Sequence, residues 1–544
     1  MSTASNPKGT KFMPEYDTEH VVGMFSSAQI HMLGAWLDAN LPVPARGARS
    51  PFDGAGLLAV AAIARITGSN VRAVKAVSQP ETWELCRKEY ADVRSDGRVL
   101  PRRPPTIDQI RTFRKHITST PEMMEGLQHA FRRSSIWQAQ KLGNLQRTAG
   151  LNWARPNPRN LIYGDGTVVR PYSSARWVAH PTDKTRKVLH GSRAADPRRA
   201  RVQNIWTDVS QDDKQAIGGN FVAVHTWTEW GRVCLGTDLA TGAEQWPALR
   251  IIDALVELVG PGGGIDSVLW DRALTGWTTD YLMAKHGIQL VGKSVAVYSD
   301  SSHDKTIRAT EIKDRLAQMT LTLNKALNKL DQRVLREDAI KGIIADGPAT
   351  LGRTIYRTKS GRHDLVGGRH EVLAPVSHRV GSEDCVHHLA VDDGALYVVD
   401  PVDEIKLARA RCISATRITG ATGFGTLRVF EIPCEHGDFT YTRAWFPSTR
   451  RGSLASAAGS EPDARDTISQ LLRPLSRADG AAFDAVHGRR NDAESFNAEF
   501  KRTITHHGGA ASLSRHAQQL DFLMAAVVTN ARTWNRRCTD TCAQ

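Results

Sequence analysis

The stretch Leu161-Ile-Tyr-Gly-Asp-Gly-Thr-Val-Val169 decides the fold that the sequence predicts. It reads as a β-strand with a carboxylate, Asp165, in the middle of an apolar run. A carboxylate in that position costs several kcal/mol unless it has a partner, and the partner is commonly a metal ion. Gly164 and Gly166 flank it, and glycines in a strand let another molecule approach the backbone closely. Asp165 is therefore the first candidate site residue.

The chain changes at this strand from a helical pattern to alternating strands and helices. The elements expected after it are, in order, strands at Phe221–Trp227 and Gly231–Asp238, a helix at about Pro247–Val259, a strand at Ser267–Asp271, a helix at about Thr275–His286 and a strand at Ile288–Lys293. Three strands, helix, strand, helix, strand is the order of a ribonuclease-H-like domain. We therefore expect an α/β fold with a ribonuclease-H-like core.

Five segments follow from the same patterns. We expect a flexible lead at 1–20, a helical DNA-binding domain at 21–150, the first part of the core at 151–299, a mostly β insertion at 300–480 and the completion of the core at 481–544. The insertion opens with a predicted helix at Ile307–Leu335 and continues as short strands, for example Gly394–Asp400 and Thr426–Glu431. An Arg-rich stretch at 170–201 is either a solvated loop or a clamp for DNA.

Within the helical domain, Leu57–Val77 predicts a helix, a tight turn at Thr67–Asn70 and a second helix. Arg72 and Lys75 fall on the outward face of that second helix. A short turn followed by a polar, basic helix is typical of a helix-turn-helix that reads DNA. An ordinary helical hairpin with solvated basic residues has the same pattern, and the sequence leaves both open.

A second basic helix is expected from Thr106, which has capping-box spacing to Gln109. It carries Arg111, Arg114 and Lys115, which we expect on a solvated or DNA-facing surface.

The charge balance favours a polyanionic partner. The chain has 544 residues, a net charge of +14 and a pI near 9.6. Basic proteins bind nucleic acid because each neutralised phosphate releases condensed counterions. The most apolar stretch, Leu57–Ile66, is short and interrupted by Arg65, so we expect no membrane span. Without a hydrophobic signal core at the N-terminus, we expect a cytoplasmic protein, associated with the nucleoid when bound to DNA.

The seven cysteines are scattered, and their odd number argues for reduced thiols rather than a disulfide framework. Several lie near histidines in the insertion, namely Cys385, His387, His388, Cys412, Cys434 and His436. Their spacing matches no zinc finger or ribbon, so the sequence alone does not favour a zinc site.

Two further acidic residues stand out by position. Asp271 ends the strand Ser267–Asp271, where open α/β sheets hold their ligand sites. Glu494 lies on a helix predicted at about Asp484–Thr503. Arg490 and Lys501 share its face, about 6 Å and 10 Å along the axis, which suits a metal-binding carboxylate flanked by phosphate-binding cations. A surface helix with internal ion pairs is the alternative.

Arg490, Glu494 and Lys501 match the Tyr-x2-Arg-x3-Glu-x6-Lys signature of a group of bacterial insertion-sequence DDE transposases, with His487 at the Tyr position. Tyr163-Gly-Asp165-Gly-Thr and Leu269-Trp-Asp271-Arg-Ala resemble the first and second acidic motifs of that family. The long separation of Asp271 from Glu494 fits the strand-rich insertion that this group carries before the last acid. The resemblance covers about residues 155–540.

The resemblance implies two Mg²⁺ (or Mn²⁺) ions held by Asp165, Asp271 and Glu494, with His487, Arg490 and Lys501 binding DNA. It implies cut-and-paste transposition: cleavage at transposon ends, followed by strand transfer into target DNA. The implied partners are double-stranded DNA (the terminal inverted repeats and the target) and a second copy of the chain in a synaptic homodimer. A hairpin intermediate with a base flipped onto an aromatic residue is frequent in this group, and Trp445 is the candidate residue, with a core role as the alternative.

Two other functions compete with this interpretation. One is a catalytically silent, domesticated DNA-binding protein, and the other is a ribonuclease-H-like DNA nuclease without strand transfer. Three other acidic residues compete for the metal: Asp266 lies at the start of its strand, and Asp492 and Glu499 lie about 200° and 140° around the helix from Glu494. We expect none of them in the site.

Overall fold

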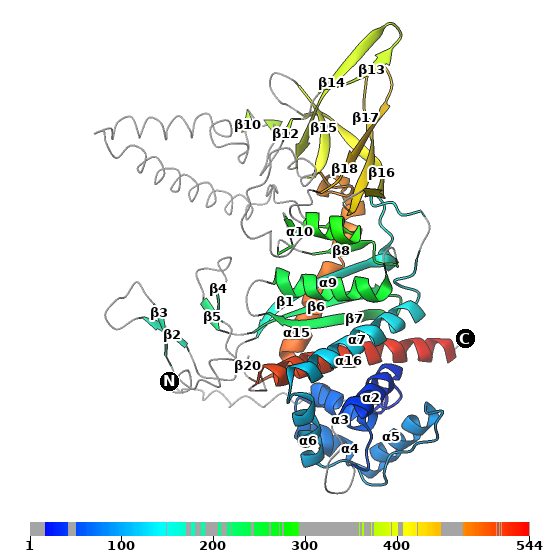
Figure 1. Ribbon diagram of the computed structural model, residues 1–544, viewed down its shortest axis with the longest axis vertical. Helices are drawn as coiled ribbons and strands as arrows, with labels where there is room; N and C mark the ends of the chain where they lie inside the picture. The colour runs from blue at the N-terminus through cyan, green and yellow to red at the C-terminus, as the bar shows by residue number, and fades with distance from the viewer. Residues whose placement is uncertain are drawn as a thin grey trace, which may run out of the picture. The chain divides into compact units, whose positions relative to one another are not determined.

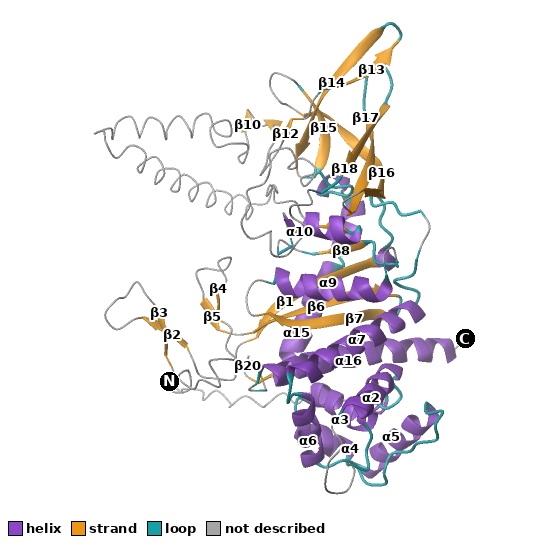
Figure 2. Ribbon diagram, viewed as in Figure 1, coloured by secondary structure: helices purple, strands orange, loops and turns teal. Residues whose placement is uncertain are grey.

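Helices dominate the first 145 residues of the computed structural model, and two larger sheets follow them along the chain (Figures 1 and 2). The structure describes residues 17–41, 50–147, 150–169, 219–240, 244–260, 263–270, 277–292, 375–392, 394–400, 406–420, 423–447, 472–506 and 514–542, with short stretches inside 176–217, 273–274, 358–372 and 509–512. The chain divides into two compact units: unit 1 contains residues 1–145, 164–258 and 491–544, and unit 2 contains 146–163 and 259–490. The protein is a mixed α/β protein, as the sequence predicts.

Seven helices open unit 1. They are α1 (Thr18–Val22), α2 (Ala28–Asn40), α3 (Gly54–Thr67), α4 (Asn70–Val77), α5 (Pro80–Asp92), α6 (Ile107–Ile117) and α7 (Pro121–Lys141). Every residue of α3 is buried, which makes it the central helix of this part. Helix α2 crosses α3 at Gly34, where a Cβ atom would lie 2.4 Å from the backbone nitrogen of Ala55. Only glycine allows so close a crossing.

Helices α3 and α4 form the predicted pair with its tight turn. Gly68 ends α3 in the left-handed conformation, with φ at 83°, and the side chain of Ser69 caps α4 by accepting the N–H of Arg72. The chain direction changes by 112° between the two helices, which lies in the range of helix-turn-helix motifs. Local sequence was sufficient to predict the two helices and the turn between them.

The five-stranded sheet has the order β7-β6-β1-β8-β9. Its elements and neighbouring helices are β1 (Leu161–Val169), β6 (Gly219–Thr228), β7 (Gly231–Ala240), α9 (Gln245–Val259), β8 (Ser267–Leu269), α10 (Trp277–Tyr281), the π-helix η2 (Leu282–His286) and β9 (Gln289–Val291). Strands β6 and β7 are antiparallel, whereas β8 is parallel to both β1 and β9. All the strands and helices that the sequence predicts around Asp165 are present.

The core of unit 1 joins parts that are far apart in sequence. Helices α15 (Arg490–Ile504) and α16 (Arg515–Cys542) contribute Phe496, Phe500 and the apolar run Leu520–Ala531 to the same cluster as Leu58 and Phe221. The predicted helical domain at 21–150 therefore shares its core with the C-terminal helices and β6. The unit boundaries therefore differ from the predicted domain boundaries.

Unit 2 contains the second, seven-stranded sheet. Its strands are β12 (Glu371–Val372), β13 (Val376–Val380), β14 (Glu383–Asp392), β15 (Ala395–Val399), β16 (Lys406–Gly420), β17 (Gly423–Ile432) and β18 (Phe439–Trp445). Strand β12 pairs with β14, each of the other strands pairs with the next along the chain, and all the pairs are antiparallel. The strands predicted within 300–480 are thus present at 371–445, whereas the predicted helix 307–335 lies outside the described residues.

The remaining described elements are short. They are η1 (Pro158–Asn160), β2 (Arg176–Ala179), β3 (Lys187–His190), β4 (Ile205–Thr207), β5 (Gln215–Ile217), β10 (Thr358–Lys359), β11 (Arg362–His363), η6 (Arg477–Asp479), α14 (Ala481–His487), β19 (Thr505–His506) and β20 (Gly509–Ala510). The side chains of the Arg-rich stretch 170–201 lie outside the described residues.

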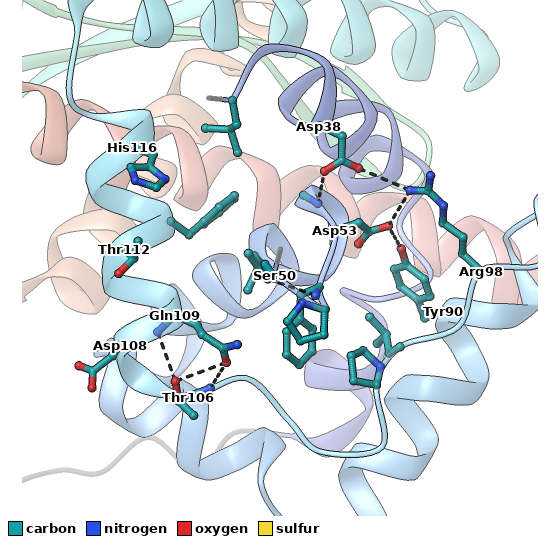
Figure 3. A pocket seen from close by; sticks show the side chains of 18 of the residues that line it. Asp38, Ser50, Asp53, Tyr90, Arg98, Thr106, Asp108, Gln109, Thr112 and His116 are labelled. Atoms are coloured by element: carbon teal, nitrogen blue, oxygen red, sulfur yellow. Dashed lines mark hydrogen bonds and ion pairs between the residues drawn. The ribbon is translucent and has the colours of Figure 1, made fainter. Parts of the chain in front are cut away.

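A cavity of about 1040 Å³ lies among the helices of unit 1 (Figure 3). Its polar groups pair with one another: the Tyr90 hydroxyl donates to Asp53, and the backbone N–H of Gly54 donates to Asp38 at 2.7 Å. On another wall, Thr106 and Gln109 form the predicted capping box of α6. These bonds hold helix ends together, and we assign them a structural role.

Within the described part of the chain, no single helix is both long and apolar enough to cross a bilayer.

Candidate active site

Asp165 is the middle residue of β1, and its side chain is half-buried. The Nδ2 group of Asn497 donates a hydrogen bond to its Oδ2 atom at 3.0 Å. Asn497 is itself buried on α15, and 332 positions separate it from Asp165 in the sequence. This bond connects the strand of the first predicted acid to the helix of the third.

Helix α15 packs through one apolar face. Ala493, Phe496, Asn497 and Phe500 are buried on it, at the spacing of an amphipathic helix. The Phe496 ring lies 4.6 Å from His225 of β6, and the Phe500 ring lies 4.5 Å from Phe522 of α16 (centroid distances). This packing determines which edge of the helix lies beside β1.

The predicted Arg-Glu-Lys face lies next to Asn497. Glu494 is three residues before Asn497, so their directions differ by about 60° around the helix axis. Arg490 and Lys501 point within about 40° of the direction of Asn497 by the same count. Glu494 and Lys501 are exposed, and Arg490 is half-buried. The three predicted side chains therefore follow the edge of α15 that contacts Asp165.

The competing acids of α15 lie on its other edge. Asp492 forms an ion pair with Arg232 at 3.1 Å, and Glu499 forms one with Arg532 at 2.7 Å. In unit 2, Asp266 is buried and accepts a hydrogen bond from Asn160 at 2.8 Å. Burial raises the pKa of Asp266, which is only partly offset by that bond. Each of these three acids thus has a polar partner within the fold.

Asp271 lies outside the described residues, so the structure gives no position for the second predicted acid. It does add a carboxylate that the sequence did not suggest. A Cβ atom on Gly166 would lie 2.4 Å from Glu244 Oε2 and 2.9 Å from Asn220 Oδ1. Gly166 thus leaves room for Glu244, which directly precedes α9, rather than open space for a substrate. No sequence motif marked Glu244, whereas Asn497 shares a helix face with Glu494 and could have been found from that spacing.

The helix that carries Glu494 is shorter than predicted. The sequence predicts one helix from about Asp484, but α14 ends at His487 and α15 begins at Arg490. Gly488 caps α14 at this break, because glycine is a poor residue for a helix interior. His487 stacks on Phe483 of its own helix at 4.9 Å. His487 is therefore not on the helix of Arg490, which corrects the prediction.

Trp445 is a core residue. Only 7% of it is exposed, and it belongs to a cluster with Trp153, Met283 and Ala415 in unit 2. The guanidinium of Arg428 lies 5.4 Å from its ring centroid. This burial favours the alternative core role of Trp445 over the DNA-binding role that the resemblance implies.

The basic helices of unit 1 differ in exposure. Lys75 is exposed and Arg72 is half-buried on α4, whereas Val77 is fully buried. On α6, Arg111 is exposed, but Arg114 is buried and forms an ion pair with Asp521 at 2.6 Å. The expectation that Arg114 lies on a solvated or DNA-facing surface is wrong, because the carboxylate of α16 draws it inward.

The uncharged ring of His225 packs against Phe496 of α15. Burial, reinforced by the nearby guanidinium of Arg232, lowers its pKa well below the ordinary value. A neutral imidazole is what its contact with Phe496 requires.

No protein-family model and no curated protein matches this chain.

Proposed function

We propose that this chain is a metal-dependent DNA transposase that cuts DNA at transposon ends and joins the freed ends to target DNA. The observation that carries the proposal is the hydrogen bond from Asn497 Nδ2 to Asp165 Oδ2, 3.0 Å long. Because Glu494 is one helical turn from Asn497, this bond makes a common site for the first and third acids physically reasonable.

The sheet supports a ribonuclease-H-like core. Such a core needs an antiparallel pair beside parallel strands, and the order β7-β6-β1-β8-β9 with its observed directions satisfies that need. Tyr163 of β1 pairs with Leu269 of β8 in parallel register. Each of the two predicted acids, Asp165 and Asp271, follows its paired residue by two positions in the sequence. This equal spacing in the sequence supports the proposal that the two acids belong to one site.

The donor atoms at Asp165 suit Mg²⁺ or Mn²⁺. The Oδ1 atom of Asn497 is buried and has no hydrogen-bond partner among the described residues, and it lies on the amide that contacts Asp165. Carboxylate and amide oxygens are the ligands that these ions prefer. Bound there, with Asp271 and Glu494 as further ligands, two ions would activate the attacking water or 3′-hydroxyl and stabilise the leaving 3′ oxygen.

The remaining residues of α15 serve DNA binding in this proposal. Arg490 and Lys501 flank Glu494 on one helix edge, and their charges attract the phosphates on either side of the scissile bond. The basic balance of the whole chain, +14, supports the same partner. Joining two transposon ends requires two active sites, so we propose that the chain works as a homodimer.

The test is cleavage of a labelled duplex that carries the inverted repeats flanking the gene, in Mg²⁺ and then in EDTA. Asp165→Asn, Asp271→Asn and Glu494→Gln should each abolish nicking while leaving DNA binding within a few-fold of wild type. Glu499→Gln is the matched control, because it makes the same change on the other edge of α15. It should retain nicking.

Three outcomes separate the alternatives. Metal-dependent nicking followed by joining to a target plasmid supports the transposase. Nicking without joining supports a nuclease, and tight binding without nicking supports a silent DNA-binding protein. Either of the last two results overturns the proposal.

A further inference from the structure

Four potential metal ligands converge in the insertion of unit 2. They are His378, Cys385, His387 and Cys434, whose ligand atoms all lie within 4.8 Å of one another. The set differs from the residues that stand out in the sequence: it includes His378 and excludes His388, Cys412 and His436. His378 joins the set through strand pairing, because it lies directly opposite Cys385 in the β13–β14 hairpin.

The β13–β14 hairpin supplies three of the four ligands. His378 and Cys385 are directly opposite each other in the antiparallel pair. His387 follows Cys385 by two residues, so both side chains emerge on the same face of β14. His388, the next residue, emerges on the opposite face. The hairpin is long and regular (Figure 1), so it holds these three ligands in a fixed arrangement.

The fourth ligand, Cys434, comes from the turn between β17 and β18. In this turn the N–H of Gly437 donates to the carbonyl of Cys434 at 3.1 Å, and Gly437 has φ at 111°. The backbone N–H of His436 points at Cys434 Sγ from 3.4 Å. An N–H donated to sulfur stabilises a thiolate, so this turn prepares Cys434 to bind a metal.

The spacing of the ligand atoms is that of a tetrahedral zinc site. Sulfur–sulfur and sulfur–nitrogen edges of such a site are about 3.8 Å and 3.5 Å, given the usual zinc–ligand bond lengths. The two Sγ atoms of Cys385 and Cys434 lie 3.7 Å apart. His378 Nε2 lies 3.2 Å from Cys434 Sγ, and His387 Nε2 lies 3.4 Å from Cys385 Sγ.

An aromatic ring borders the cluster. Phe439 of β18 stacks on His378 with centroids 4.1 Å apart and lies 5.1 Å from His387. Such apolar contacts orient metal-bound imidazoles and limit solvent access. They also connect the β13–β14 hairpin to β18 on the side where the four ligands meet.

We propose that His378, Cys385, His387 and Cys434 bind one structural Zn²⁺ ion, which clamps the β13–β14 hairpin to the β17–β18 turn. Four protein ligands leave no open position for substrate, as in other structural zinc sites. Thiolate and imidazole ligands select zinc over the hard Mg²⁺ ion. The site is therefore chemically distinct from the one around Asp165, and the proposal does not depend on the proposed function.

The first experiment measures metal content. Full-length protein, purified without added metal and without a metal-chelating step, should contain about one zinc per chain by atomic emission. Cys385→Ser and Cys434→Ser should each lose most of it. Cys412→Ser and His388→Gln are the matched controls, because they alter the same residue types nearby outside the cluster, and they should keep it.

The second experiment uses the wild-type protein, so that a variant that fails to fold cannot obscure the result. Replacing zinc with Co²⁺ should produce the visible absorption bands of a tetrahedral, thiolate-bound cobalt ion. Removing the metal with a chelator should lower the thermal unfolding temperature, and adding zinc back should restore it. A wild-type chain without stoichiometric zinc and without cobalt bands overturns the proposal, as does a Cys385–Cys434 disulfide in freshly purified protein.

Discussion

The amide of Asn497 is the contact that connects two distant parts of the candidate site. It donates to a carboxylate, and hydrogen bonds to charged groups contribute about 1.5–3 kcal/mol. A buried amide in that position restricts the Asp165 side chain to one direction before any metal arrives. Asn497 thus positions Asp165 through its Nδ2 group, while its Oδ1 atom is the one offered to the metal in our proposal.

Replacing this amide should weaken the binding of Mg²⁺ more than it lowers the free energy of unfolding. We expect Asn497→Ala to lower the cleavage rate about 10–100-fold, the usual cost of losing a group that orients a metal ligand. The Mg²⁺ concentration for half-maximal cleavage should rise, and high Mg²⁺ should restore part of the activity. The measurement is a Mg²⁺ titration of the nicking rate.

Asn491→Ala is the control, because Asn491 is an exposed asparagine on the same helix. It should leave the titration unchanged. A slower Asn497→Ala enzyme with wild-type Mg²⁺ dependence would show that the amide supports only the fold.

At the scale of the elements, we predict that helix α4 contributes to DNA binding. Its exposed stripe includes Val71, Lys75 and Ser78, and the half-buried Arg72 borders that stripe. The remaining face packs inward through Ala73, Ala76 and Val77. The basic residues of α4 are thus accessible without any change in the fold.

The double variant Arg72→Ala, Lys75→Ala should bind transposon-end DNA more weakly. Each lost phosphate contact reduces the slope of log affinity against log salt by about 1. The measurement is a DNA titration at several salt concentrations. Arg133→Ala with Lys141→Ala removes the same charge from exposed positions on α7 and should retain the slope. Equal effects of the two double variants would assign α4 to the scaffold.

At the scale of the whole molecule, an ion cluster around Asp521 contributes to the stability of unit 1. This buried carboxylate of α16 contacts Arg65 of α3 at 3.1 Å and Arg114 of α6 at 2.6 Å, and it accepts a hydrogen bond from Ser512 at 2.5 Å. Burial alone would raise the pKa of Asp521, but the two guanidinium groups outweigh it and hold the pKa below its ordinary value. The cluster joins three helices from the two ends of the chain.

The lowered pKa predicts how stability depends on pH. A carboxyl whose folded pKa is depressed contributes its full stabilisation above its unfolded pKa, about 3.9, and loses it as the pH falls through the folded pKa. The wild-type free energy of unfolding should therefore decline below about pH 4. Asp521→Asn should lack this step and should be less stable at neutral pH by about 3–5 kcal/mol, since it leaves two buried arginines unpaired.

Urea unfolding at pH 7 and near pH 3.5 measures both effects. Asp92→Asn, at an exposed position at the end of α5, should unfold like wild type at both pH values. A stable Asp521→Asn protein at neutral pH would contradict the assigned role of the cluster.

Sequence alone determined the features that depend on neighbours along the chain. The turn between α3 and α4 follows from Gly68 and Ser69, because a left-handed C-cap and a side-chain N-cap are local interactions. The strand around Asp165 and the shared face of Arg490, Glu494 and Lys501 follow from the periods of strands and helices. These features could be predicted without any knowledge of the packing.

Only the tertiary structure decided which side chains have partners. Asp492 and Glu499 are ion-paired with Arg232 and Arg532, Trp445 is in a core, and Arg114 is drawn inward by Asp521. The four ligands proposed for zinc come from the strands of the β13–β14 hairpin and from the β17–β18 turn, and they match no sequence pattern. The physical reason is common to all of them: burial and pairing depend on residues tens to hundreds of positions away, and the spacing of a motif carries no information about those residues.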